Sequence, residues 1–213
     1  MNQNKSPDMQ ERFKEIIKDS LSPLMKKHKF RKYGNKYKLV GDKLTYIVTI
    51  YKSRYNIEGC LDFRLEWGIA LNDDQKRPEI LFLTEALYGN HRDLMPDPYP
   101  SFFKLKETDS ETLDADLKVT ISNIVETKIF PFIFSFKSTN DIIKILENTP
   151  VKQARWGTPA PGQTLKWLAI LYFFIYKPET SVKLLDQAMQ ETKIEAAKEN
   201  SKMLKEKIAK TMR

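Results

Sequence analysis

The chain has 213 residues, of which 41% are hydrophobic and 30% are charged, and its formal net charge is +8. A chain of this length can bury roughly 70% of its unfolded surface, so it needs neither a metal nor a disulfide to stabilise a core. Its one cysteine, Cys60, excludes an intrachain disulfide, and residues 1–12 lack the apolar run of a secretory signal. These features lead us to expect a cytoplasmic protein.

Residues 8–28 have the pattern of an amphipathic helix. Apolar side chains recur at every third or fourth position, and they are Phe13, Ile16, Ile17, Leu21, Leu24 and Met25. Asp8 and Glu11 have the spacing of a capping box at the helix start. Pro23 falls late in the pattern, so we expect it to kink the helix or to divide it into two.

Strand patterns follow at residues 36–40, 44–51 and 61–71. The last is the clearest, because six apolar side chains alternate with polar or small ones over eleven residues. The short connections between these strands favour antiparallel pairing. With 102–106 as a short edge strand, the pattern predicts an α+β fold with an antiparallel sheet of three to five strands.

The chain after about residue 110 is predicted to be helical, beginning with a helix that Ser110 or Thr112 caps. Prolines and glycines in 151–163 predict a linker. We therefore predict a sheet domain over 1–150 and an all-helical extension over 164–213. The apolar run Trp167–Tyr176 is about half as long as a membrane span, which predicts a buried helix that packs the extension on the sheet domain.

Three stretches of the chain carry a resemblance to a known family. They are Leu24–Tyr37 (LMKKHKFRKYGNKY), the strands that contain Tyr51–Ser53 and Phe63–Ile69, and Phe130–Phe132 followed by Ser138–Leu146. These stretches resemble a bacterial family known only as domain of unknown function 4304, in which a glycine is favoured at the position of Lys29. The resemblance implies an α+β fold and no assigned activity.

No catalytic, metal or cofactor motif is apparent in the sequence. His28 and His91 are the only histidines, and neither has the spacing to Cys60 or to the other that a metal site needs. His91–Leu94 copies the start of a protein-kinase catalytic loop, but Pro98 stands where that loop needs an asparagine. We therefore expect no metal, no cofactor and no recognisable catalytic residue, and a non-enzymatic function is the favoured interpretation, with an enzyme that has an unfamiliar site as an alternative.

The most distinct charged feature is the basic segment, residues 26–38. Five of its cations lie within seven positions, and they are Lys26, Lys27, Lys29, Arg31 and Lys32. Phe30, Tyr33 and Tyr37 are interleaved with them. Cations neutralise phosphates and aromatic rings stack on bases, so the segment is a candidate surface for single-stranded nucleic acid. A solvated helix end, whose lysines complement the helix dipole, is the simpler interpretation.

Arg155 and Trp156, in the predicted linker, form a second candidate contact. Arg and Trp are enriched among the interface residues that dominate binding energy. More often, a tryptophan at such a place anchors the linker to its own domain.

Three hypotheses for function follow from these patterns. The first is a non-enzymatic protein-binding module, such as an immunity or regulatory partner of another bacterial protein. The second is a nucleic-acid-associated protein that uses the basic segment. The third is an enzyme with an unfamiliar site in the cleft between the sheet domain and the helical extension. No membrane partner is expected, and the sequence identifies neither the partner nor the oligomeric state.

Overall fold

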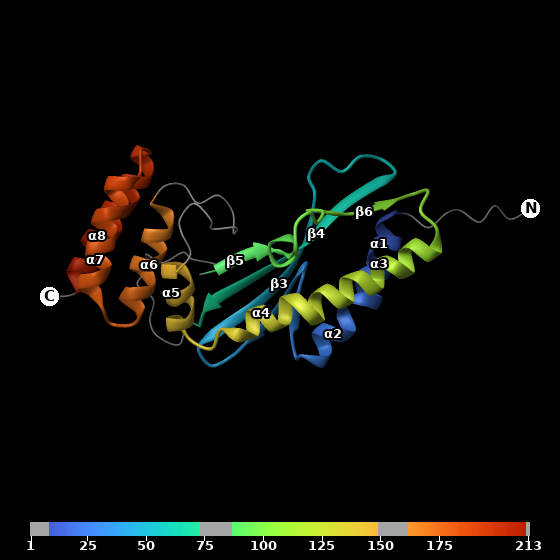
Figure 1. Ribbon diagram of the computed structural model, residues 1–213, viewed down its shortest axis with the longest axis horizontal. Helices are drawn as coiled ribbons and strands as arrows, with labels where there is room; N and C mark the ends of the chain where they lie inside the picture. The colour runs from blue at the N-terminus through green and yellow to red at the C-terminus, as the bar shows by residue number, and fades with distance from the viewer. Residues whose placement is uncertain (1–8, 73–86, 149–161, 212–213) are drawn as a thin grey trace, which may run out of the picture. The chain divides into compact units, whose positions relative to one another are not determined.

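The computed structural model describes residues 9–72, 87–148 and 162–211, and it has the predicted α+β class (Figure 1). The strands are β1 (Arg31–Tyr33), β2 (Lys36–Val40), β3 (Leu44–Lys52), β4 (Cys60–Leu71), β5 (Leu87–Asn90) and β6 (Phe103–Lys106). The α-helices are α1 (Met9–Ser20), α2 (Ser22–Lys27), α3 (Glu111–Ile124), α4 (Phe130–Ser135), α5 (Thr139–Asn148), α6 (Gln163–Phe174), α7 (Pro178–Glu191) and α8 (Glu195–Thr211). A 3-10 turn, η1 (His91–Leu94), and a π-helical turn, η2 (Val125–Ile129), complete the described elements.

The predicted antiparallel sheet is confirmed, with six described strands where three to five were expected. Its order is β1-β2-β3-β4-β5, and β6 also pairs with β4. The additional strands are β1 and β5, of three and four residues, which are too short to leave a periodic pattern. In the β1–β2 hairpin Arg31 pairs with Lys38 and Tyr33 with Lys36, a register that the Gly34 turn permits with its φ of 60°.

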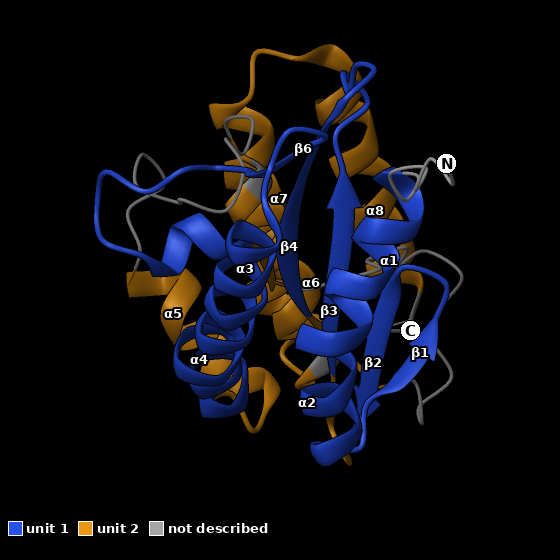
Figure 2. Ribbon diagram, turned by 90° about the vertical axis from the view of Figure 1, so that its right-hand side faces the viewer, with its two compact units in different colours: residues 1–40, 46–68, 90–135 blue, residues 41–45, 69–89, 136–213 orange. Residues whose placement is uncertain are grey.

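The strict alternation of β4 places one face of the strand in the core. Five of its six alternating apolar side chains are at most 2% exposed, namely Leu61, Phe63, Leu65, Trp67 and Ile69, and the sixth, Leu71, is partly buried. The ring of Phe13 on α1 meets Phe63 edge-on at 5.0 Å, and Phe132 on α4 meets Trp67 in the same way at 4.9 Å. Helices α1–α4 therefore cover this face of the sheet (Figure 2).

Pro23 divides the first predicted helix into α1 and α2, as the sequence suggested. It lies in the first turn of α2, where a missing N–H breaks no helical hydrogen bond. At the other end of α2, Lys29 donates from its backbone to Lys26 and Phe30 donates to Met25. This Schellman ending requires a left-handed residue, and Lys29 has a φ of 62° there.

The chain forms two compact units (Figure 2). The described residues of unit 1 fall within 1–40, 46–68 and 90–135, and they include α1–α4 and most of β3 and β4. A forked ion pair between Arg12 and Asp114 joins α1 to α3 inside this unit.

Unit 2 takes its described residues from within 41–45, 69–89 and 136–213. Its core lies among α6, α7 and α8 and consists of Ala169, Ile170, Leu185, Leu204 and Ile208. The ring of Trp167 meets Tyr88 of β5 at 5.8 Å, and the Tyr172 hydroxyl donates to Glu147 of α5. The prediction of a buried helix over Trp167–Tyr176 is confirmed for Trp167–Leu171, but the helix ends at Phe174 and Tyr176 is 77% exposed.

Among the described helices, none is by itself long and apolar enough to cross a membrane. Two helical segments, 111–135 and 139–148, reach the length and apolar composition of a membrane span only when they are counted together. The predicted domain boundaries stay a prediction, and 151–161 of the linker lie outside the described residues.

Candidate functional site

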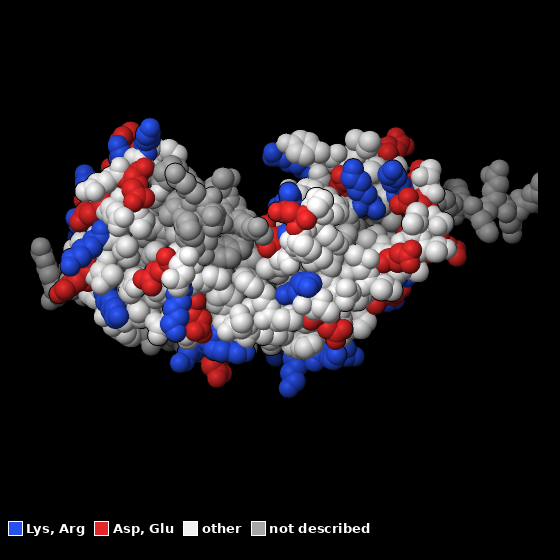
Figure 3. Space-filling view, in the orientation of Figure 1, with Lys and Arg blue, Asp and Glu red and all other residues white. Residues whose placement is uncertain are grey.

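The basic segment begins in the last turn of α2 and continues through the β1–β2 hairpin. Lys26, Lys27, Lys29, Arg31 and Lys32 are all exposed. Basic side chains gather in Figure 3 along the lower edge of unit 1, where Figure 1 places α2. Lys27 forms an ion pair with Glu126 at 3.0 Å, with both side chains about half exposed or more. The segment is therefore a solvated basic surface.

Two of the three interleaved aromatic residues belong to the core. Phe30 stacks on Phe130 at 5.5 Å and is 7% exposed, and Tyr37 is 2% exposed. Tyr33 is different, because 55% of it is exposed and the ammonium of Lys38 lies 5.7 Å from its ring. Only Tyr33 of these three can therefore stack on a ligand.

The hairpin register divides the basic segment between two faces of the sheet. Side chains that pair directly across two strands share a face, and neighbours along a strand alternate. Arg31 and Lys38 therefore share one face with Tyr33, whereas Lys32 lies with Tyr37 on the face that the helices cover. The cations of the segment do not form a single patch.

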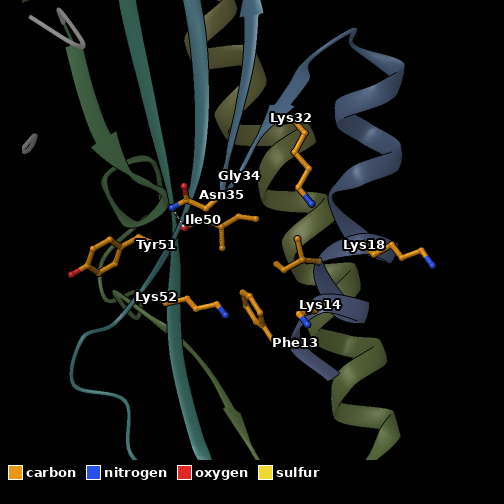
Figure 4. A pocket seen from close by; sticks show the side chains of 10 residues that line it. Phe13, Lys14, Lys18, Lys32, Gly34, Asn35, Ile50, Tyr51 and Lys52 are labelled. Atoms are coloured by element: carbon orange, nitrogen blue, oxygen red, sulfur yellow. Dashed lines mark hydrogen bonds between the residues drawn. The ribbon is translucent and has the colours of Figure 1, made fainter. Parts of the chain in front are cut away.

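On the side of Lys32, the structure has a pocket of about 530 Å³, which we call the basic pocket (Figure 4). Helix α1, the β1–β2 hairpin and β3 supply its ten lining residues, which are Phe13, Lys14, Ile17, Lys18, Lys32, Gly34, Asn35, Ile50, Tyr51 and Lys52. Lys32 and Lys52 extend toward the interior from different walls, Lys18 extends outward along α1, and the Tyr51 ring points away (Figure 4). Four of the ten lining residues are lysines and none is acidic.

The walls of the pocket are fixed by hydrogen bonds between elements that are distant in sequence. Ile50 donates its backbone N–H to the Asn35 carbonyl at 2.9 Å, and the Asn35 side-chain amide donates to the Ile50 carbonyl at 3.1 Å. The hairpin turn is thereby held against β3. This contact brings Lys32 and Lys52 to the same pocket.

The surroundings of Lys52 disfavour its positive charge. Its ammonium lies 4.4 Å from the centre of the Phe13 ring and donates to Gln10 at 2.7 Å. Loss of surrounding water lowers the pKa of Lys52, and the nearby charge of Lys14 lowers it further. A bound anion would stabilise the charged form of Lys52 and so oppose both the loss of water and the repulsion by Lys14.

Acidic groups lie at the outer side of α1. Lys14 pairs with Glu11 at 2.5 Å, and both side chains are at least 60% exposed. Asp19 pairs with Lys118 at 2.7 Å, a contact that lowers the pKa of Asp19. Exposed pairs of this kind are weak, so Lys14 can exchange Glu11 for a ligand at small cost.

Three of the pocket lysines were not singled out by sequence reasoning, namely Lys14, Lys18 and Lys52. Lys14 and Lys18 are four residues apart on α1, a spacing that places both on one side of the helix. Their approach to Lys52 depends on the pairing of the hairpin with β3, which no local pattern reveals. Arg155 and Trp156, the other predicted contact, lie outside the described residues.

The surroundings of His91 and Cys60 favour a structural role for both residues. His91 is completely buried, stacks on Phe103 at 4.5 Å, and places Nδ1 3.4 Å from the Leu65 carbonyl. Burial lowers the pKa of His91. The Cys60 thiol is partly buried, 3.7 Å from the Asp62 carboxylate. Within the described ranges, no three His, Cys, Asp or Glu side chains are grouped closely enough to hold a metal ion.

No family model, curated protein or solved structure matches the chain, so membership of the family of unknown function 4304 stays a prediction.

Proposed function

We propose that unit 1 binds single-stranded nucleic acid through the basic pocket and the adjoining basic segment. The observation that carries the proposal is that lysines from three elements line a pocket whose lining has no carboxylate, and that Lys32 and Lys52 extend into it from different walls. Lysines that neutralise phosphates release condensed counterions, which supplies most of the affinity of nonspecific nucleic-acid binding. Lys26, Lys27 and Lys29 extend the positive charge beyond the pocket.

The shape of this surface favours a single strand over a duplex. Duplex DNA is read by a helix or a β-ribbon that enters a groove about 12 Å wide. Here the cations lie at a helix end, around a turn and inside a pocket of about 530 Å³, a volume typical of sites for small molecules.

The conformation of Lys29 gives further support. A side chain in the left-handed region costs roughly 1–2 kcal/mol, a cost that glycine avoids. Lys29 occupies such a position at the end of α2, and its ammonium extends the basic surface. Strain that persists in a folded protein is concentrated at functional sites, so its presence here favours a role for the positive charge.

The experiment is a fluorescence-anisotropy titration of 12-nucleotide single strands of RNA and DNA at 50 mM salt. The variants Lys32→Glu and Lys52→Glu should weaken binding strongly, and each should reduce the salt slope by about 1 if one phosphate contact is lost. Lys207→Glu, on the exposed surface of α8, is the matched control because it changes the net charge equally. Equal effects at all three positions would mean that only net charge matters and would contradict the proposal.

A second candidate function, a protein-binding module, is supported by the loop between β3 and β4. Tyr55 and Ile57 are 76% and 74% exposed, and the guanidinium of Arg54 lies 4.9 Å from the Tyr55 ring. The loop is nevertheless ordered by local bonds, because Tyr55 N–H donates to Ser53 Oγ and Asp62 N–H donates to Asn56 Oδ1. A preorganised loop that presents Tyr and Arg loses little entropy on binding.

A photo-crosslinking amino acid at position 55 tests this second candidate in the native cells. The control carries the same group at position 119, where Val119 is 69% exposed on α3. A discrete protein adduct at 55 but not at 119 is the expected result. The same adduct pattern at both positions would count against a specific interface at this loop.

A further inference from the structure

Lys14 and Lys52 are two lysines from different elements that line the basic pocket, and Lys14 also pairs with the exposed Glu11. Both line the pocket, and they lie close enough for the charge of Lys14 to disfavour the charged form of Lys52. Like charges held together are unfavourable in the protein alone, and an anion placed between them reverses the sign of the interaction. The arrangement therefore favours a ligand with concentrated negative charge.

The Lys52 ammonium contacts one buried ring and one exposed amide. Phe13 is 5% exposed and is held by Phe63 on the core side of the sheet, while its ring lies under the Lys52 ammonium. Gln10 accepts a hydrogen bond from the same ammonium. One or more of the three ammonium hydrogens remain to be donated to a ligand.

Lys32 supplies a third cation from another wall of the pocket. It extends from β1 toward the interior, and the bonds between Asn35 and Ile50 hold the hairpin in place (Figure 4). Three lysines from α1, β1 and β3 therefore surround a single concave space. A phosphodiester inside a strand carries one negative charge, whereas a phosphate monoester carries about 1.5 to 2 near pH 7.

We infer that the basic pocket seats a phosphate monoester on a nucleotide, namely the terminal phosphate of a bound strand, with Lys14, Lys32 and Lys52 as its ligands. This inference rests on the proposed function. The pocket is large enough for one nucleotide-sized group, and the strand continues over the basic segment. A free nucleoside monophosphate presents the same chemical group, and the experiment distinguishes these two sources.

The test compares three versions of one 12-nucleotide strand, with a 5′-phosphate, a 3′-phosphate or neither, each labelled at an internal base. We expect one of the phosphorylated strands to bind about tenfold more tightly than the strand with two hydroxyl ends. Lys52→Gln and Lys14→Gln should each abolish this preference. Lys27→Gln, outside the pocket, should weaken all three strands equally, and urea denaturation verifies that each variant is folded.

A second readout follows the acetylation rate of Lys52 by mass spectrometry, with adenosine monophosphate as the free ligand. Equal binding of the three strands would overturn the inference and leave the proposed function standing. Failure of every strand to bind, together with protection of Lys52 by adenosine monophosphate, would identify a mononucleotide site and overturn the proposed function. If no strand binds and adenosine monophosphate does not protect Lys52, both the inference and the proposed function are overturned.

Discussion

The ion pair between Arg12 and Asp114 should contribute strongly to the stability of unit 1. The Arg12 guanidinium donates to both carboxylate oxygens of Asp114, at 2.5 and 2.6 Å, and these bonds raise the pKa of Arg12. It also donates to the carbonyls of Lys106 and Asp109, both at 2.9 Å. One side chain thus joins α1 to α3 and to the segment that precedes α3.

The substitution Arg12→Ala removes both hydrogen bonds to the Asp114 carboxylate and one each to the carbonyls of Lys106 and Asp109. The side chains of Arg12 and Asp114 are only 11% and 16% exposed, so water replaces these bonds poorly. Loss of one partner of a buried pair costs about 3–5 kcal/mol. In a protein of this size, that loss should lower the melting temperature of unit 1 by roughly 6–20 °C.

Urea denaturation at pH 7, followed by circular dichroism, measures the change in the free energy of unfolding. The matched control is Lys27→Ala, which removes the exposed pair with Glu126 and should cost less than about 1 kcal/mol. A third variant, Arg12→Met with Asp114→Leu, removes both charges and should recover part of the loss. The reasoning is refuted if Arg12→Ala is no more destabilising than Lys27→Ala.

Three further outcomes are expected. Burial lowers the pKa of His91 below its ordinary value of 6.5. Below pH 6.5 the unfolded chain therefore binds a proton at this histidine more readily than the folded chain does. The free energy of unfolding should be unaffected by His91 above pH 6.5 and should decrease as the pH falls below it. In urea titrations at pH 7.5 and 5.5, the variant His91→Phe should lose less stability between the two pH values than the wild type does. An equal loss in both proteins would show that His91 does not cause the decline. Gly162→Ala should cost roughly 1–3 kcal/mol or more, because φ is 82° and the new Cβ would lie 2.6 Å from the Ala188 carbonyl oxygen. Gly34→Ala, with φ of 60° and open space around it, should cost only about 1 kcal/mol, and equal losses in thermal melts would show that the steric contact is unimportant. Lys29→Gly should stabilise the protein by about 0.5–1 kcal/mol while weakening strand binding, and stabilisation without weaker binding would remove Lys29 from the site.

The elements that the sequence predicted well are those whose signal is local. The alternation in β4 required only that neighbouring side chains face opposite ways, and Pro23 divided the first helix because of its own missing N–H. Ser110 caps α3 by accepting a hydrogen bond from the Leu113 N–H, as one of the two proposed caps. In each case the residues that cause the structure are adjacent in the chain.

The candidate site was predicted only in part, because its residues meet through long-range pairing. Lys32 was in the predicted basic segment, but Lys14 and Lys52 join it only when Asn35 pairs with Ile50. The same hairpin register separates Arg31 from Lys32, so a continuous run of charges became two surfaces. Charge density along a sequence therefore indicates that a protein is basic in a region, but not which cations face the same ligand.

The salt dependence of single-strand binding tests the central claim most directly. If the lysines of the pocket and of the basic segment together neutralise about four phosphates, a plot of log affinity against log salt between 50 and 200 mM should have a slope of about −3. The slope should become about one unit less steep in Lys32→Glu and remain unchanged in Lys207→Glu. Absence of binding at 50 mM salt, or an affinity that does not vary with salt, would contradict a nucleic-acid site in unit 1.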